Sequence, residues 1–112
     1  MLPESIPFDD AVRNTRNASL MSHALTTRPD LLFTATEDFL HQSYRAEAMP
    51  ESYALVQKLR GAGIAAFISG AGPTVLALHT ADQRELEELK LAGGKAFEAT
   101  ILEIASRGAT LL

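Results

Sequence analysis

The spacing of apolar residues in the first sixty positions predicts helices. Apolar residues recur every three or four positions over 9–26, the period of one helix face. Asp9 and Asp10 suit a helix amino terminus, because their carboxylates can cap backbone N–H groups and oppose the helix dipole. Prolines at the starts of 29–40 and 50–60 predict two further helices. The expected buried faces are Ala11, Ala18, Met21 and Leu25, then Leu32, Ala35 and Phe39, then Leu55, Val56 and Leu59.

The second half of the chain predicts strands and one more helix. Short apolar runs at 64–69 and 74–79 predict two buried strands. Thr80 with Gln83 forms a T-x-x-Q capping signature for a helix over 81–91. Residues 97–104 predict a third strand, with a helix as the alternative, because Glu, Ala and Leu also favour helices. The order of these elements predicts an α+β fold, a two-layer sandwich of helices on an antiparallel sheet.

Composition limits the classes of function. The 112 residues predict one domain, 1–112, and 46% hydrophobic residues suffice for a core. The net charge of −4 argues against nucleic-acid and anionic-membrane partners. The chain has no cysteine, and no metal-ligand spacing stands out, so no metal site is predicted. No apolar run approaches the ~20 residues needed to span a bilayer, and the start lacks signal-peptide features, so we expect a cytoplasmic protein.

A turn of small residues, Ser69-Gly70-Ala71-Gly72-Pro73-Thr74, joins the two predicted strands. Glycine permits positive φ and allows a ligand to approach the backbone closely. Such a loop suits backbone recognition of a substrate or a phosphate. The alternative is an ordinary hairpin turn that needs glycine for its geometry alone.

This turn resembles the third signature motif of the GHMP kinases, which include galactokinase, homoserine kinase and mevalonate kinase. Further stretches resemble the start of the carboxyl-terminal domain of bacterial homoserine kinases and the segment that follows it. They read LP (2–3), IPFDDAVRN (6–14), DLL (30–32), ATEDFLHQSYR (35–45) and AMPES (48–52). These motifs follow one another in the same order as in the family, and together they cover most of residues 2–80. Residues 81–112 resemble the family only weakly. The resemblance implies the ferredoxin-like carboxyl-terminal fold of these kinases.

The resemblance also implies a reaction. The full enzyme would transfer the γ-phosphoryl group of ATP to the side-chain hydroxyl of L-homoserine, giving O-phospho-L-homoserine in threonine biosynthesis. ATP and Mg²⁺ would bind mainly to an amino-terminal domain, whose phosphate loop of the type P-x-x-x-G-L-G-S-S has no counterpart in this sequence. The implied partners are L-homoserine, that domain and a second copy in a homodimer. No residue here is predicted to be catalytic, and the chain alone is expected to be inactive.

Arg45 is the first candidate for binding the substrate. A guanidinium can hold a carboxylate through two parallel hydrogen bonds, which suits an amino-acid kinase. The resemblance implies this role, because the arginine of the matching His-Gln-Pro-Tyr-Arg stretch has it in homoserine kinases. Here Ser43 replaces the proline. The alternative is a surface arginine paired with Glu47.

The remaining candidates lie on the first helix, after the second, and in the turn. The family pattern Asn-x-x-Arg begins at Asn14, but its fourth position is occupied here by Asn17. An arginine, Arg16, lies one residue before that position. Because one step turns a helix by about 100°, either Arg16 reaches round or this half of the site is weakened. A solvated polar face is the alternative. His41 either positions a substrate hydroxyl or caps the carbonyls of the preceding helix. The predicted substrate-binding set is Arg45, Gly70, Ala71, Gly72, Asn14, Arg16, Asn17 and His41.

Two other functions agree with this sequence. One is a stand-alone small-molecule-binding or dimerisation module, since a ferredoxin-like sandwich supports such roles and fold does not decide function. The other is the carboxyl-terminal domain of another GHMP kinase that acts on a different small alcohol.

Overall fold

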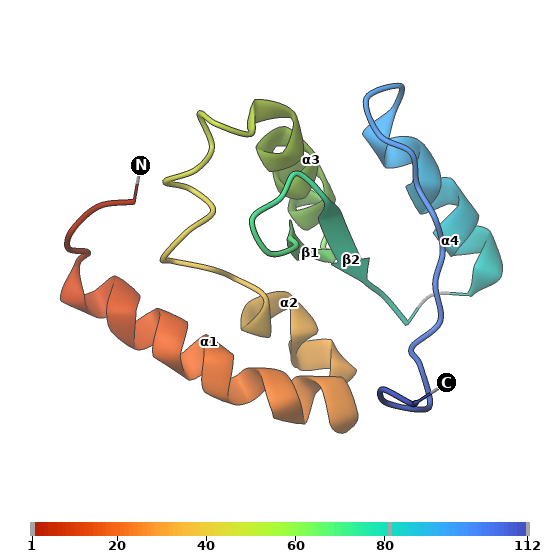
Figure 1. Cartoon of the computed structure of the whole chain (residues 1–112), viewed down its shortest axis with the longest axis horizontal. Coiled ribbons are helices and arrows are strands. Elements are labelled where there is room, and N and C mark those ends of the chain that lie inside the picture. The colour runs from red at the N-terminus through yellow and green to blue at the C-terminus, as the bar shows by residue number, and fades with distance from the viewer. Residues whose placement is uncertain (1, 81, 112) are drawn as a thin grey trace. The chain divides into compact units, whose positions relative to one another are not determined.

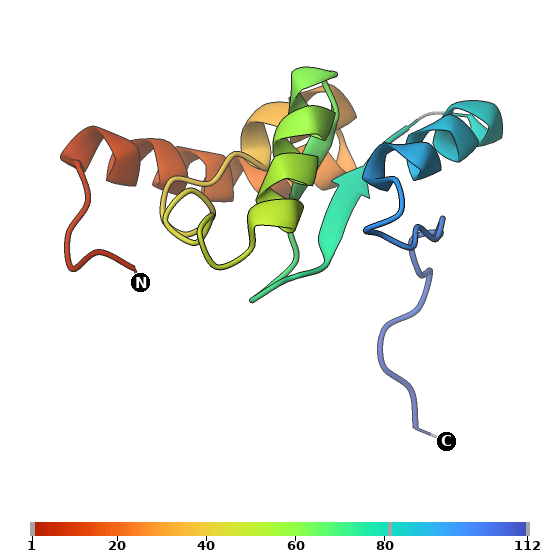
Figure 2. The same cartoon turned by 90° about the horizontal axis from the view of Figure 1, so that it is seen from above.

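The computed structural model describes residues 2–80 and 82–111, and it divides into two compact units, Met1–Thr80 and Ala81–Leu112. The first unit contains most of the regular structure (Figure 1). A turn-rich connection, yellow in Figures 1 and 2, leads from α2 to α3. In chain order, the elements of this unit are α1 (Phe8–Thr26), the 3₁₀ turn η1 (Pro29–Leu31), α2 (Leu32–Ala35), α3 (Pro50–Gly61), β1 (Ala65–Ile68) and β2 (Val75–Leu78). Helices with an antiparallel pair of strands confirm the α+β class.

The α1 helix forms as predicted, but its amino terminus and its buried face differ from the prediction. Pro7 is the N-cap residue, no side chain caps the helix, and the two aspartates lie within the first turn. Ala24 is fully buried, whereas Leu25 is 48% exposed. The buried face is therefore rotated by about one residue, because α1 packs against η1 and α2.

The helix predicted over 29–40 is confirmed over its first part, as η1 and α2, but its predicted end is wrong, because helical structure ends at Ala35. Thr36 Oγ1 donates to the Leu32 carbonyl at 2.7 Å and competes with continuation of the helix. Beyond it, the backbone of residues 37 and 39 bonds to side chains of α1. These tertiary contacts replace the helical hydrogen bonds that the local sequence favours, and Phe39 lies outside the helix.

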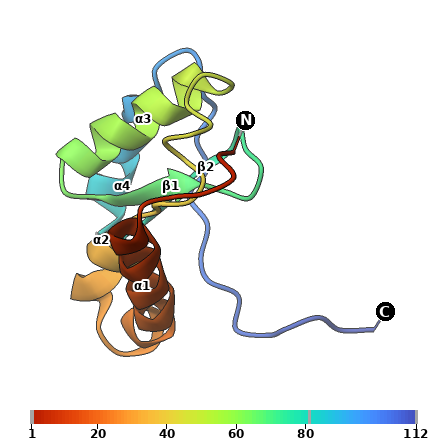
Figure 3. The same cartoon turned by 90° about the vertical axis from the view of Figure 1, so that its left-hand side faces the viewer.

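The α3 helix and the hairpin follow the predicted pattern. Val56 and Leu59 are buried, Leu55 is half-buried, and Gly63 follows the helix with a φ of 83°. The strands β1 and β2 pair antiparallel, with Ala65 opposite Leu78 and Ile68 opposite Val75. In Figure 3, α3 lies above the hairpin, and α1 and α2 lie below it. The core beneath β1 joins Ala24, Leu32, Ala35 and Ala65.

Arg60, near the end of α3, connects three elements of the first unit. Its guanidinium lies 4.2 Å from the centroid of the Phe33 ring and donates to the Phe33 carbonyl. Nη1 also donates to Thr36 Oγ1 at 2.9 Å and to the Ala66 carbonyl at 3.2 Å. Burial lowers the pKa of Arg60, against a smaller opposing effect of the Glu37 charge. A cation with this many partners fixes α3 against α2 and β1.

The second unit has little regular structure. It contains α4 (Gln83–Leu89) and the 3₁₀ turn η2 (Lys90–Gly93). Asp82, rather than Thr80, caps α4, because its Oδ1 accepts the Glu85 N–H at 3.0 Å. The predicted strand over 97–104 is wrong, and so is the helical alternative, since these residues adopt neither. Leu102 is 79% exposed, so no apolar face is buried there to stabilise a strand.

Candidate functional site

A cavity of about 660 Å³ lies in the first unit, between α1, the connection from α2 to α3, and the end of β1. It collects residues that are far apart in the sequence. Five of the predicted substrate-binding residues line it, namely Asn14, Asn17, His41, Arg45 and Gly70. The other three, Arg16, Ala71 and Gly72, do not.

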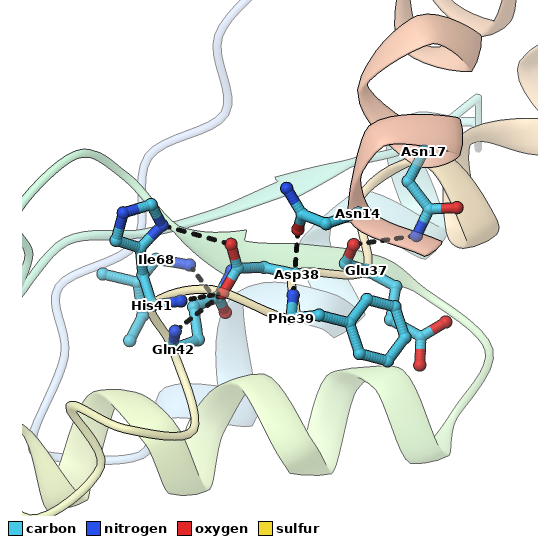
Figure 4. Close-up of polar contacts among 8 residues, drawn as sticks. All are labelled: Asn14, Asn17, Glu37, Asp38, Phe39, His41, Gln42 and Ile68. Carbon is cyan, nitrogen blue, oxygen red and sulfur yellow. Dashed lines mark hydrogen bonds and ion pairs between the residues drawn. The ribbon is translucent and has the colours of Figure 1, made fainter. Parts of the chain in front are cut away.

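Two asparagines of α1 hold the backbone beside this cavity. Asn17 Nδ2 donates to the Glu37 carbonyl at 2.9 Å, and Asn14 Oδ1 accepts the Phe39 N–H at 3.0 Å (Figure 4). Residues three apart share a helix face, so both amides reach the same segment. Asn17 is only 1% exposed, so a solvated polar face is wrong for this residue. Together the two amides fix the positions on either side of Asp38.

Arg16 reaches round the helix towards residue 17. Its Nε and Nη2 donate to Asn17 Oδ1 at 3.2 and 3.1 Å. The guanidinium therefore bonds to the side chain that stands where the family pattern has arginine. It does so at the rim, because Arg16 is exposed and does not line the cavity.

Asp38 organises the turn that carries His41. Its Oδ2 accepts the backbone N–H groups of His41 and Gln42, each at 2.7 Å, and its Oδ1 lies 3.3 Å from His41 Nδ1. Burial works to raise the pKa of Asp38, but the hydrogen bonds from Gln42 and His41 outweigh it, and the pKa is lowered. The residue is therefore an ionised acceptor at neutral pH. His41 does not cap the preceding helix, because its ring contacts this carboxylate instead.

Gln42 attaches the same turn to the sheet. Its Oε1 accepts the Ile68 N–H at 3.4 Å, at the edge of β1 that faces away from β2. The sequence reasoning did not include Gln42 and Asp38 in the site. The only signal in the sequence was local. An aspartate in a turn commonly accepts hydrogen bonds from backbone N–H groups a few residues further on, as Asp38 does here from positions 41 and 42.

Arg45 supplies the positive charge of the cavity. It is half-buried, and its backbone N–H donates to the His41 carbonyl at 3.0 Å. Within 2–80 and 82–111, the ion pairs involve other residues, so the alternative pairing with Glu47 is not formed. A guanidinium at a cavity wall without a carboxylate partner suits a ligand that brings one.

The two glycines of the hairpin turn have different roles. Gly70 lines the cavity, whereas the Gly72 N–H donates to the Ser69 carbonyl at 3.0 Å within the turn itself. Gly72 has a φ of 77°, and a Cβ there would meet Met49 Sδ. The Met49 side chain is flexible and can move, so the positive φ is the main reason for glycine at position 72, as the hairpin interpretation holds.

The lining of the cavity does not fit a triphosphate or its metal ion. Its charged side chains are Glu37, Asp38 and Arg45, with His41, and no lysine or nest of glycines surrounds them. In the described part of the chain, no three or more His, Cys, Asp or Glu residues gather where they could hold a metal ion. No described helix has the length and apolar character that a membrane span needs. The mixed charges fit a small zwitterion instead.

The comparisons with known proteins define the class first. Residues 15–99 match the family model described as GHMP kinases C terminal, which is more than half of the chain. The chain belongs to this family.

Individual relatives within this family are named homoserine kinase. The chain is 53% identical over 112 residues to the homoserine kinases of Streptomyces avermitilis and of Streptomyces coelicolor, covering 100% of this chain and 36% of each relative. It is 49% identical over 104 residues to the homoserine kinase of Cutibacterium acnes, covering 92% of this chain and 35% of that protein. The chain thus spans about a third of the length of these relatives, and the resemblance predicted from the motifs is confirmed.

Proposed function

We propose that this chain is the substrate-side domain of a homoserine kinase, which transfers the γ-phosphoryl group of ATP to L-homoserine and gives O-phospho-L-homoserine in threonine biosynthesis. The relatives that carry this name support the reaction. One structural observation carries the assignment of the site. The half-buried Arg45, in no ion pair within 2–80 and 82–111, lines a cavity that also contains carboxylates and amides.

The lining residues match the chemistry of homoserine, a zwitterion with a hydroxyl group. Arg45 receives the carboxylate, because its planar fork donates two parallel hydrogen bonds. The negative charge of Asp38 lies in the same cavity and favours the ammonium group. Holding both charges orients the side-chain hydroxyl, and phosphoryl transfer depends mainly on such positioning.

The nucleotide and its magnesium ion belong to a separate amino-terminal domain in this proposal. When bound, they supply the phosphoryl group and neutralise its charge. The residues described here offer neither a triphosphate cradle nor a metal site, so their part is to bind and orient the acceptor alcohol. We therefore expect no ATP-dependent turnover from the 112-residue chain by itself. The complete enzyme is a cytoplasmic homodimer in this proposal.

The experiment is a domain exchange. Residues 1–112 replace the matching region of the Streptomyces coelicolor homoserine kinase, and steady-state kinetics are measured with homoserine and with ATP. We expect phosphorylation of homoserine by the chimera. Arg45→Ala lowers kcat/KM for homoserine about ten- to hundredfold through KM, because a hydrogen bond to a charged group contributes about 1.5–3 kcal/mol. The KM for ATP stays nearly unchanged, and Arg45→Lys recovers little, since a point charge lacks the fork.

Arg28→Ala is the matched control. Arg28 belongs to the same unit but is exposed, pairs with Asp30 at 2.7 Å, and lies outside the cavity. We expect wild-type kinetics from this variant. A well-folded chimera that phosphorylates another small alcohol but not homoserine would contradict the substrate. Wild-type kinetics from Arg45→Ala would contradict its role in carboxylate binding and leave Arg16 as the next arginine to test.

A further inference from the structure

His41 has one ring nitrogen at a carboxylate and the other directed away from it (Figure 4). Its Nδ1 lies 3.3 Å from Asp38 Oδ1, and its side chain is 51% exposed at the cavity. A neutral imidazole has one donor nitrogen and one acceptor nitrogen. The partner of Nδ1 therefore decides what Nε2 can do for a ligand.

We propose that Asp38 is a positioning residue that holds His41 in the Nδ1–H tautomer, so that Nε2 presents a hydrogen-bond acceptor to a donor group in the cavity. An ionised carboxylate only accepts hydrogen bonds, so its contact with Nδ1 is favourable only when Nδ1 carries the proton. The same carboxylate accepts the His41 and Gln42 backbone N–H groups at Oδ2, which fixes the carboxylate group and leaves Oδ1 facing the ring.

The position of the carboxylate is itself fixed from outside the turn. Asn17 bonds to the carbonyl of Glu37, and Asn14 bonds to the N–H of Phe39, so the residues on both sides of Asp38 are tied to α1. Gln42 ties the far end of the turn to Ile68 of β1. A rigid helix and a strand therefore support the carboxylate that orients the ring, an arrangement that holds a binding group in one geometry.

The ligand must offer an N–H or O–H group to Nε2. Ammonium and hydroxyl groups are the donors of a small amino alcohol, and homoserine has both. This assignment of the ligand rests on the proposed function, whereas the assignment of the tautomer does not.

The first test is nuclear magnetic resonance of the ¹⁵N-labelled 112-residue chain. Long-range ¹H–¹⁵N spectra at about pH 8, where an ordinary imidazole is neutral, report which ring nitrogen carries the proton. The spectrum of His41→Gln identifies the signals of His41, and the ring of His23 serves as an internal reference. We expect His41 to have a protonated Nδ1 and a bare Nε2. A predominance of the Nε2–H form in the wild-type chain overturns the proposal, whatever the variants show.

Asp38→Asn reverses the tautomer in a way that a merely structural role would not. The amide oxygen takes the place of Oδ2, because the two backbone N–H groups require an acceptor there. The NH₂ group then faces His41 Nδ1 and only donates, so the proton moves to Nε2. Asp30→Asn is the matched control, since that carboxylate pairs with Arg28 at the surface, and it leaves the His41 signals unchanged. A folded Asp38→Asn chain that retains Nδ1–H overturns the proposal.

The second test concerns the ligand and uses the chimera described above. Asp38→Asn places an Nε2–H group where a donor should bind, so KM for homoserine rises about tenfold, while KM for ATP is unchanged. Unchanged homoserine kinetics together with a reversed tautomer overturn the assignment of the ligand. A parent chimera without activity on homoserine contradicts the proposed function, and the tautomer result is then unaffected.

Discussion

The two compact units of this chain use their apolar residues in opposite ways. Within residues 2–80, strands and helices bury a core that includes Val56, Leu59 and Ile68. Among residues 82 and 84–111, for which burial is described, none is buried, and Leu91, Leu102 and Ile104 are 78%, 79% and 86% exposed. Apolar sequence alone therefore does not produce a strand, because the strand needs a partner and a face to cover.

The comparison also separates local from tertiary control of structure. In the second unit, α4 forms where a cap and a run of helix-forming residues coincide. In the first unit, side-chain bonds across 20 and 25 positions end α2 and build the turn at Asp38. The site residues come from the unit in which such long-range bonds exist.

The largest expected effect comes from removing the same atoms in each unit. Leu59→Ala creates a cavity in the core and costs about 2–5 kcal/mol in the free energy of unfolding. Leu102→Ala removes an exposed side chain and changes it by about 0.5 kcal/mol or less. Chemical denaturation of the 112-residue chain measures both. Similar losses would contradict the difference in packing between the units.

A second test removes one of the long-range bonds. Asn17→Ala leaves the Glu37 carbonyl without its donor and costs about 1–3 kcal/mol, because this partly buried hydrogen bond is lost together with the contacts of an amide that is only 1% exposed. Thr15→Ala is the control, since Thr15 is exposed and bonds only within its own helix at the Ala11 carbonyl. Thermal unfolding of both variants decides the matter, and an unaffected Asn17→Ala would exclude a structural role for the amide.

The third prediction concerns the local cap of the second unit. Asp82→Ala removes the acceptor for the Glu85 N–H and destabilises α4 by about 1 kcal/mol. The helical chemical shifts of Gln83–Leu89 decrease, while those of α1 and α3 do not. Unfolding of α1 or α3 in this variant would show that the units are coupled.

The smallest expected effect is a dependence on pH. The pKa of Asp38 is lowered in the folded chain, so the ionised carboxylate stabilises the folded state. This contribution to the free energy of unfolding is complete above the ordinary pKa of about 3.9 and is lost as the pH falls through the pKa of the folded chain. Asp38→Asn removes this part of the acid sensitivity below about pH 4. Asp30 also has a lowered pKa, through its hydrogen bond to Arg28, but it is exposed, so the effect of Asp30→Asn disappears in high salt. If the Asp38→Asn chain had the acid sensitivity of the wild type, Asp38 would not contribute to the pH dependence of stability.

Local patterns predicted much of the first unit and little of the second. Helices near 9–26 and 50–60 and the hairpin around Gly70 follow from apolar spacing, prolines and glycines. The end of α2 did not follow, because two asparagines of another helix determine it. The strand over 97–104 was predicted from composition, which does not show whether a neighbouring strand is present.

The lining of the cavity was predicted in part, and from a different kind of information. Resemblance to a family, rather than periodicity, grouped Asn14, His41 and Arg45, and the structure brings them to one cavity. It also predicted Ala71 and Gly72, which do not line it. Asp38 was missed because its acceptor role depends on the turn conformation, which apolar spacing does not reveal.

The outer edge of β1 has a consequence for association with other molecules. The N–H of Ile68 bonds to Gln42, and the carbonyl of Ala66 bonds to Arg60, both at the edge that does not face β2. A strand that adds to a sheet must use these same groups. An incoming strand would first have to break both side-chain bonds, so the residues that attach the turn and α3 to β1 also protect this edge from aggregation.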